Sequence, residues 1–329
     1  MDHSVFIFTF NRSVLLKRQL RLFKLLNIHS KLYILDGSSD INEVNRNKKI
    51  SKEFNAEYFF EESYINRFFL INQLNSSPYL SYCADDDLID PRFYKKSVDF
   101  LESYKDYAVV TGRVLCLQYN SKHKYLGYRF VNHLPNDYDI NTDDFIYNFI
   151  SLRSAYALGC PPTHYGVRRA ECHKILGKYI KELKYRTDVE LLEFLSAVVV
   201  GKIKTLEVFM GLRDYYNGPI VGGLRDSNKL NNNWEFLKNI GKKELKLKGY
   251  SESYCDFASN YILDFNLPPV DRILKTTTRK NYLSFKENKV RAVFEVFKHF
   301  ILNNVNEFKD SGIDRIFLKS FRKVFFKND

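Results

Sequence analysis

Three consecutive carboxylates, Asp85, Asp86 and Asp87, directly follow an apolar run and are the clearest chemical signal in the sequence. At a separation of ~5 Å and an effective dielectric constant of about 20, each unpaired pair of carboxylates repels by roughly 3 kcal/mol. A hard divalent cation removes this repulsion, and carboxylate oxygens suit Mg²⁺ or Mn²⁺, which keep coordination positions for substrate phosphates. The alternative is an acidic surface loop whose Asp residues cap the next helix.

Two other polar segments follow apolar runs in the same way. Asn11-Arg12 comes after the run 5–8, and Asp36 comes after the run 32–35. Because the carboxyl ends of parallel strands meet at one edge of a sheet, where ligands bind, we expect the three polar segments to line one crevice. For Asp36 the alternative is a plain turn, since Asp-Gly-Ser is ordinary turn chemistry.

Strand-like and helix-like patterns alternate through the first 215 residues. The expected strands are 5–8, 32–35, 57–60, 79–83, 108–110, 114–117, 128–131 and 203–207. The expected helices include 67–74, one that starts at Asp90-Pro91, 143–150 and 188–200. This order predicts a mostly parallel sheet with helices on both faces. The segment 159–166 holds paired prolines and two glycines, so we expect it to be irregular.

Three of these segments, in this order, resemble the successive signatures of family 2-like GT-A glycosyltransferases. The segments are 6–12, 33–40 and 82–91, and the resemblance extends over about residues 4–215. It implies a GT-A catalytic domain over 1–215, of the α/β class, with a Rossmann-like, mostly parallel central sheet. The remaining 216–329 lacks the alternation and is predicted to be a mainly helical, basic and amphipathic C-terminal region.

The resemblance assigns the family's ligand contacts to particular residues. Contacts with the nucleotide of a nucleotide-sugar donor fall on Thr9, Asn11, Arg12, Asp36 and Asp85. Contacts with the metal, Mn²⁺ or Mg²⁺, fall on Asp86 and Asp87. The usual first Asp of this loop is replaced by Ala84, so the sequence leaves open which two carboxylates of the run bind the metal.

A fourth match concerns the general base. Thr187-Asp188 before an apolar run resembles the family's Glu-Asp helix start, whose Asp deprotonates the acceptor hydroxyl. The resemblance implies an inverting displacement with Asp188 as the base and with a glycan or lipid-linked glycan as acceptor. The alternative is a capping box of Thr187 with Glu190, which explains those two residues but not Asp188.

Four further residues are candidates for contacts with the acceptor or with phosphate. His164 and Tyr165 belong to the irregular segment and are candidates for the acceptor site. Arg168 is a candidate for holding an anionic acceptor, and Arg213 aligns with a basic residue of the family that faces phosphate. The alternatives are a plain loop, a basic helix start and a solvated surface arginine.

The formal net charge of +12 predicts an anionic partner without identifying it. Nucleic-acid binding is one alternative function, but no motif for it is present and basic residues are scattered among acidic ones over 1–215, so we expect no nucleic-acid partner. The other alternative is a GT-A-like protein that binds sugar nucleotides without turnover, because Ala84 and Thr187 depart from the family pattern.

The five scattered cysteines form no Cys-x-x-Cys pair, which argues against disulfides or a zinc ribbon and predicts a cytoplasmic protein. Neither a signal peptide nor a membrane span is expected. Apolar residues recur helically over 290–301 and 313–325, with basic residues among the second set. These helices are expected either to pack on the catalytic domain or a second subunit, or to bind an anionic membrane peripherally at its inner face. A homo-oligomer is compatible with the sequence.

Overall fold

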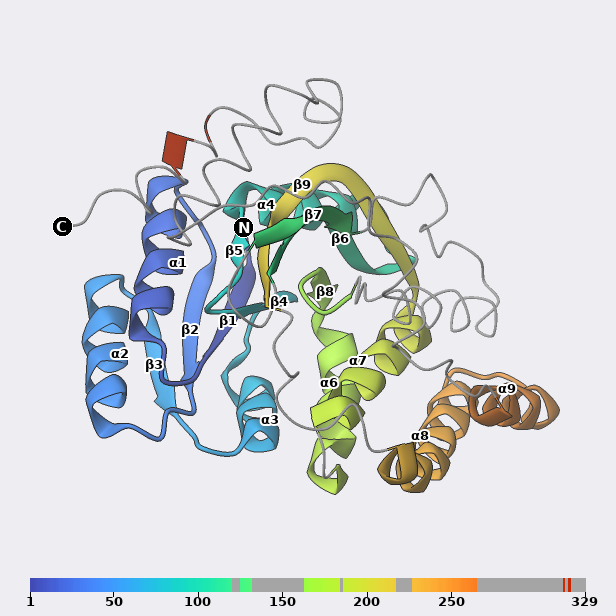
Figure 1. The fold of residues 1–329 in the computed structure, drawn as a ribbon. Coiled ribbons are helices and arrows are strands. Elements are labelled where there is room, and N and C mark those ends of the chain that lie inside the picture. The colour runs from blue at the N-terminus through green and yellow to red at the C-terminus, as the bar shows by residue number, and fades with distance from the viewer. Residues whose placement is uncertain are drawn as a thin grey trace.

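A mixed sheet forms the centre of the protein (Figure 1). The computed structural model describes residues 1–119, 125–131, 163–183, 186–216, 227–264, 316, 319 and 320. The strands in this part of the chain are β1 (His3–Thr9), β2 (Lys31–Asp36), β3 (Glu57–Phe60), β4 (Tyr79–Ala84), β5 (Leu88–Ile89), β6 (Tyr107–Tyr119), β7 (Tyr125–Val131), β8 (Val167–Arg169) and β9 (Lys202–Tyr216). The helices are α1 (Ser13–Leu25), α2 (Ile41–Glu53), α3 (Tyr64–Leu74), α4 (Pro91–Ser103), α6 (Ala170–Tyr179), α7 (Arg186–Val200), α8 (Ser227–Leu247) and α9 (Glu252–Asp264), and the 3-10 turn is η1 (Ile180–Glu182).

Most strands of the sheet point the same way. The strand order is β3-β2-β1-β4-β8-β6-β9-β5, and β7 pairs with β6. The first four of these strands are parallel to one another. β8 pairs antiparallel with both β4 and β6, so β6 runs in the direction of β4, and β9 pairs parallel with β6. The carboxyl ends of β1, β2, β3, β4, β6 and β9 therefore lie at one edge, as the strand-helix alternation predicts.

Alternate side chains of the central strands enter two separate apolar layers. Phe6 of β1 packs in one layer, whereas Val5 and Ile7 pack in the other. This division follows from the two-residue repeat of a strand. Side chains of α1, α2 and α4 complete the second layer, and those of α3, α6, α7, α8 and α9 complete the first. In Figure 1, α1 and α2 lie beside β1 to β3, and α8 and α9 lie beyond α7.

Short polar caps start the helices that follow the strands. Asp40, Ser63 and Asp90 are the N-cap residues of α2, α3 and α4, and each side chain accepts a hydrogen bond from a backbone N–H of the first turn. Pro91 occupies the first turn of α4, where no backbone donor is lost. The helix start expected at Asp90-Pro91 is confirmed, and the connections from strand to helix are short at the carboxyl edge.

Two strands are longer than their apolar runs predict. The runs 108–110 and 114–117 belong to one strand, β6, and β9 extends well beyond 203–207 because the two strands pair along their length. Gly112 interrupts the apolar pattern, but a Cβ there would lie 2.8 Å from the carbonyl oxygen of Val208. The glycine thus permits close approach of β9. Residues 163–166 form turns and a bend, as expected of the irregular segment, and 143–150 lies outside the described residues.

The described part of the C-terminal region is helical. Leu237 of α8 and Cys255 of α9 belong to the same apolar layer as α7, and Glu244 of α8 accepts hydrogen bonds from Lys178 (2.7 Å) and the Tyr179 hydroxyl (2.5 Å). The division of the chain at 215 and 216 stays a prediction. The apolar repeats at 290–301 and 313–325 lie outside the described residues apart from 316, 319 and 320. Within the described residues, no helix combines the length and apolar character needed to cross a bilayer.

Two histidines are buried in the neutral form. The ring nitrogens of His3 lie 2.8 Å and 3.0 Å from two serine hydroxyls, and the ring of His173 contacts the Tyr82 hydroxyl and lies 3.1 Å from the Phe68 carbonyl oxygen. Burial lowers the pKa of both imidazoles from 6.5 to about 3. At these two groups the unfolded chain therefore binds more protons than the folded one between these values, and their contribution to stability falls as the pH decreases below 6.5.

We expect that lowering the pH from about 7.5 to about 5.5 reduces the free energy of unfolding by about 1.4 kcal/mol for each buried histidine. Urea unfolding at the two pH values measures this change. The buried carboxyl of Asp85, with its pKa raised to about 7, changes stability in the opposite direction over this range, equally in wild type and variants. The contribution of one histidine, about 1.4 kcal/mol, should therefore be missing from the pH-dependent change in His3→Gln and in His173→Gln when each is compared with wild type. The same pH dependence in all three proteins would show that these rings do not remain neutral in the folded state.

Candidate functional site

The loops after β1, β2 and β4 meet at the carboxyl edge of the sheet. Thr9 at the end of β1 lies opposite Asp36 at the end of β2, and Phe8 lies opposite Ala84 at the end of β4. The backbone N–H of Asp85 donates to the carbonyl oxygen of Phe8 at 3.1 Å. The three polar segments that the sequence predicts to share a crevice are therefore next to one another.

The acidic turn, residues 85–87, is bound by β1 and by the loop after it. The Thr9 hydroxyl donates to Asp85 Oδ2 at 2.7 Å. The guanidinium of Arg12 bridges two carboxylates, with Nη2 2.8 Å from Asp85 Oδ1 and Nη1 2.6 Å from Asp86 Oδ2. The repulsion expected within the acidic turn is thus offset by a cation of the same chain.

Strand β5 closes the other end of the acidic turn against β9. Ile89 lies opposite Gly211 in the antiparallel pair, and the N–H of Asp90 donates to the carbonyl oxygen of Met210 at 2.8 Å. A Cβ at Gly211 would lie 2.6 Å from the carbonyl oxygen of Leu88, so the close approach of the two strands requires glycine. Both ends of the turn are therefore held by the sheet.

Burial divides the three carboxylates of the acidic turn. Asp85 and Asp87 are 0% and 3% exposed, whereas the side chain of Asp86 is 33% exposed. Burial raises the pKa of Asp85 to about 7, and the charge of Arg12 opposes that shift. Asp86 is therefore the carboxylate of the turn that faces solvent and can accept a further ligand.

The donor chemistry of the acidic turn fits Mg²⁺ or Mn²⁺. Within the described residues, no group of three or more His, Cys, Asp or Glu side chains is arranged to hold a metal ion. Such ions also bind through one or two carboxylates together with substrate phosphates and water. The exposed carboxylate of Asp86, flanked by Asp85 and Asp87, suits that second mode. A metal here would have to compete with Arg12 for the carboxylate oxygens.

Asn11 joins the loops after β1 and β2. Its backbone is left-handed, with φ 53°, a conformation in which Asn is enriched among non-glycine residues. Its N–H donates to Ser38 Oγ at 2.8 Å, and its Oδ1 accepts from the N–H groups of Ser39 and Asp40 at 3.0 Å and 3.1 Å. Asn11 thus positions both loops, and its contact with a nucleotide stays a prediction.

The carboxylate of Asp36 is fully buried and bonded within the chain. Its Oδ1 accepts from the N–H of Ser38 at 2.8 Å, and its Oδ2 accepts from Asn47 Nδ2 at 2.9 Å and from the Tyr58 hydroxyl at 2.8 Å. These bonds give Asp36 the turn-forming role considered as the alternative. Its contact with a nucleoside stays a prediction, one that would require a rearrangement of these bonds.

Arg67 of α3 is a candidate that the sequence pattern did not reveal. Its side chain is 7% exposed, and Nη1 donates to the carbonyl oxygen of Thr9 at 3.2 Å. Its guanidinium carbon lies 5.8 Å and 5.6 Å from the ring centres of Phe8 and Tyr64. Arg67 therefore places a buried positive charge beside the end of β1. The available signal was a lone arginine one turn before Ile71 on the buried face of a helix.

Gly37 provides the space for the Arg67 guanidinium. A Cβ at position 37 would lie 2.6 Å from Cζ of Arg67. We expect Gly37→Ala to displace this guanidinium and to lower the free energy of unfolding by about 1–3 kcal/mol. Denaturant unfolding of both single variants and the Gly37→Ala/Arg67→Ala double variant measures the coupling. Gly37→Ala should lower the free energy of unfolding less in the Arg67→Ala variant than in wild type. An equal decrease in both proteins would refute the contact between Gly37 and Arg67.

A buried ion pair ties residues 163–166 to α7. Nη2 of Arg168 lies 2.6 Å from Glu193 Oε1, and Nδ1 of His164 lies 2.7 Å from Glu193 Oε2. Burial acts to raise the pKa of Glu193, but the charges of Arg168 and His164 hold it below its usual value, at about 2. The Arg168 guanidinium is buried 4.2 Å from the centre of the Tyr82 ring, and Tyr165 packs in an apolar layer. The contacts of His164, Tyr165 and Arg168 with an acceptor stay predictions. In the structure, each of the three side chains contacts other residues of the protein.

Asp188 lies in the first turn of α7 and is 1% exposed. Because α7 leads into β9, its N-terminus lies at the carboxyl edge of the sheet. Arg168 contacts both Glu193 of α7 and Tyr82 of β4, and so connects this helix to the strand that leads into the acidic turn. The role of Asp188 as general base stays a prediction.

α7 begins at Arg186, one residue before Thr187. The capping box considered as the alternative for Thr187 and Glu190 stays a prediction. Arg213 lies on β9 opposite Cys116 of β6, and its neighbour Leu212 pairs with the residue after the acidic turn. The phosphate contact of Arg213 stays a prediction.

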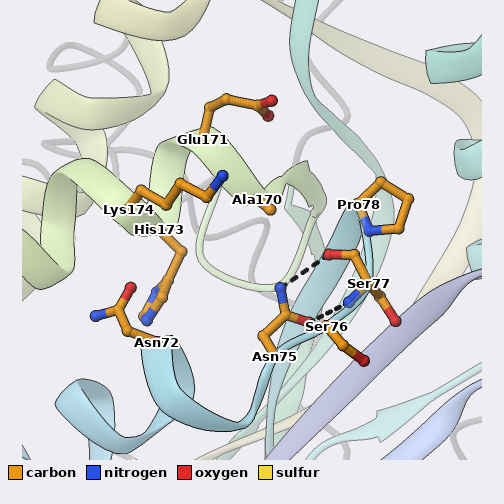
Figure 2. Close-up of a pocket in the computed structure, with 9 residues that line it drawn as sticks. All are labelled: Asn72, Asn75, Ser76, Ser77, Pro78, Ala170, Glu171, His173 and Lys174. Carbon is orange, nitrogen blue, oxygen red and sulfur yellow. Dashed lines mark hydrogen bonds between the residues drawn. The ribbon is translucent and has the colours of Figure 1, made fainter.

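A separate cavity of about 330 Å³ lies at the opposite, amino edge of the sheet, where β4 begins (Figure 2). It lies between the end of α3, with Asn72 and Asn75, and the start of α6, with Lys174. The Asn75 side chain donates to the carbonyl oxygen of Ser77 at 2.9 Å and accepts from its N–H at 3.3 Å. These polar groups shape the loop before β4 and take no part in the crevice.

Comparisons with known proteins identify the fold. No protein-family model and no curated protein matches the sequence. TarS from S. aureus, residues 1–349, is 11% identical and aligns over 99% of this chain and 81% of that chain, with a TM-score of 0.50. A second TarS structure is 13% identical over 98% of this chain, with a TM-score of 0.51, and the chain spans 55% of its length.

The mannosyltransferase PcManGT from Pyrobaculum calidifontis, in complex with GDP-Man and Mn²⁺, is more distant. It is 8% identical over 100% of this chain and 88% of that chain, with a TM-score of 0.41. At the identities of the TarS structures the likeness shows the fold alone. The chain has a GT-A glycosyltransferase-like fold, with a mostly parallel central sheet covered by helices.

Proposed function

We propose that this protein is a glycosyltransferase that moves a sugar from a nucleotide-sugar donor to a glycan or a lipid-linked glycan. The observation that carries the proposal is the contact of the acidic turn with Thr9 and Arg12 at the carboxyl edge of the sheet. In open parallel sheets, ligands bind at this edge. The GT-A-like fold supports a nucleotide-activated sugar as that ligand.

The charges at this edge suit a diphosphate that arrives with a metal. Arg12 and Arg67 are cations on either side of the end of β1, and the acidic turn supplies carboxylates for Mn²⁺ or Mg²⁺. A metal held by Asp86 with Asp85 or Asp87 would stabilise the negative charge that develops on the departing diphosphate. The half-exposed guanidinium of Arg12 beside the acidic turn supports a contact with the same diphosphate.

Asp188 is the proposed general base. As the acceptor oxygen forms a bond to the anomeric carbon, the bond from that carbon to the phosphate oxygen breaks, and the nucleoside diphosphate leaves with the electron pair. The acceptor hydroxyl gives its proton to the carboxylate of Asp188. Attack from the face opposite the leaving group inverts the configuration. The position of Asp188 in the first turn of α7, the helix that leads into β9, supports this role.

We expect Asp86→Asn to abolish metal-dependent donor binding without unfolding the protein, because it removes the solvent-facing carboxylate of the turn. A panel of nucleotide sugars with and without Mn²⁺ is scored by thermal shift, since a ligand that binds the folded state stabilises it. Asp99→Asn is the matched control, because Asp99 is an exposed aspartate paired with Lys95 on α4, away from the crevice. An unchanged Mn²⁺ response in Asp86→Asn would remove the acidic turn from the mechanism.

We expect Asp188→Asn to lower the rate of sugar transfer by about 10²–10⁴-fold while donor binding persists, because the base is lost and the donor contacts are kept. Transfer to a glycan acceptor library and thermal shift with the donor measure the two effects separately. Glu190→Gln, two residues further along α7, is the control and should transfer normally. Full activity of Asp188→Asn would contradict the assignment of the base.

A sugar-nucleotide-binding protein without turnover is the second candidate function. The burial of Asp188 favours it, because a carboxylate that is 1% exposed has little surface for an incoming hydroxyl. Donor binding without transfer or hydrolysis, in the presence of Mn²⁺ and varied acceptors, would select this second function.

A further inference from the structure

Arg12 occupies the carboxylate oxygens that a metal would need. It contacts Asp85 Oδ1 at 2.8 Å and Asp86 Oδ2 at 2.6 Å, so one guanidinium neutralises two members of the acidic turn. A divalent cation on Asp86 would lie close to this guanidinium, and two positive charges repel at such a distance. Metal and guanidinium therefore compete for the same oxygens.

Arg12 is the arginine of this site that is able to move. Its side chain is 41% exposed, and it lies in the loop between β1 and α1, where it makes no side-chain cap of the helix. Arg67, by contrast, is buried under Gly37 and between two aromatic rings. A half-exposed guanidinium can rotate away through solvent, whereas the buried one is held by packing.

The acidic turn does not depend on Arg12 alone for its shape. Thr9 donates to Asp85, the N–H of Asp85 donates to the Phe8 carbonyl oxygen, and Arg18 Nη2 donates to the backbone oxygen of Asp86 at 3.1 Å. These bonds persist when the Arg12 side chain leaves. The turn can therefore exchange its cation without being rebuilt.

We propose that Arg12 is an exchangeable counter-cation, which neutralises the acidic turn in the empty site and transfers to the diphosphate when a divalent metal takes its place. The inference rests on the proposed function, since it assumes a metal-diphosphate ligand at this edge. Removing Arg12 should have opposite effects on two ligands: the metal alone loses a competitor, whereas the metal-diphosphate complex loses a contact. Coupling of this kind typically changes affinities by about 5–150-fold.

The test compares wild type, Arg12→Gln and Arg12→Lys, using Mn²⁺ alone and the preformed Mn²⁺-pyrophosphate complex as probes. Affinities are measured by water-proton relaxation and by calorimetry. Arg12→Gln should bind Mn²⁺ alone at least about 5-fold more tightly and Mn²⁺-pyrophosphate at least about 5-fold more weakly than wild type. Arg12→Lys keeps the charge, but a lysine cannot bridge two carboxylates as the planar guanidinium does. For each probe, its affinity should therefore lie between those of wild type and Arg12→Gln. If Arg12→Gln fails to fold, the opposite shifts must appear in Arg12→Lys.

Arg46→Gln is the matched control, because Arg46 is an exposed arginine paired with Glu43 at 2.7 Å on α2, and its loss should change neither affinity. Unchanged or weaker binding of Mn²⁺ alone by the Arg12 variants would overturn the exchange, and a parallel weakening of both probes would indicate a merely structural arginine. If wild type and all variants bind neither probe, the proposed function itself fails. Equal binding of the probes by all of the proteins would instead overturn only the exchange.

Discussion

The constraint on which the site depends is the presence of three adjacent carboxylates at the end of a buried strand. Such charges repel, and burial raises the free energy of each ionised form. Two groups offset this cost at Asp85: the hydroxyl of Thr9 in β1 and the guanidinium of Arg12 in the loop after β1. The parallel pairing of β1 with β4 brings these partners to the turn. Sheet register and electrostatics are thus coupled at this edge.

A fully buried ion pair joins β8 to α7 elsewhere in the molecule. Arg168 and Glu193 connect β8 to α7, and the ring of Tyr82 in β4 covers the guanidinium. Buried ion pairs are weak evidence for stability, because removing two charges from water costs about as much as their attraction returns. Their directional bonds nevertheless fix how α7 lies against the sheet.

Local pattern was sufficient to predict most of the strands along the chain and a mostly parallel sheet, but not the short strands β5 and β8 or their antiparallel pairing. Short apolar runs separated by helical periods predict parallel strands, and Asp90-Pro91 predicts a helix start from its cap chemistry alone. The same reasoning brought the three polar segments to one edge. Contacts between residues distant in sequence were not accessible in this way. The position of Arg67 under Gly37 and the pairing of Arg168 with Glu193 depend on which faces of separate elements meet.

The antiparallel pairing of β5 with β9 has a consequence for how this protein can vary. β4 is held by β1 on one side of the acidic turn, and β5 is held by β9 on the other, with glycine at 211 packed against the Leu88 carbonyl oxygen. A residue gained or lost between these two anchors must be taken up within the turn itself or by a shift in the register of one strand. Changes of length at 85–87 should therefore disturb the contacts of Thr9 and Arg12 with the turn more than exchanges of exposed side chains do.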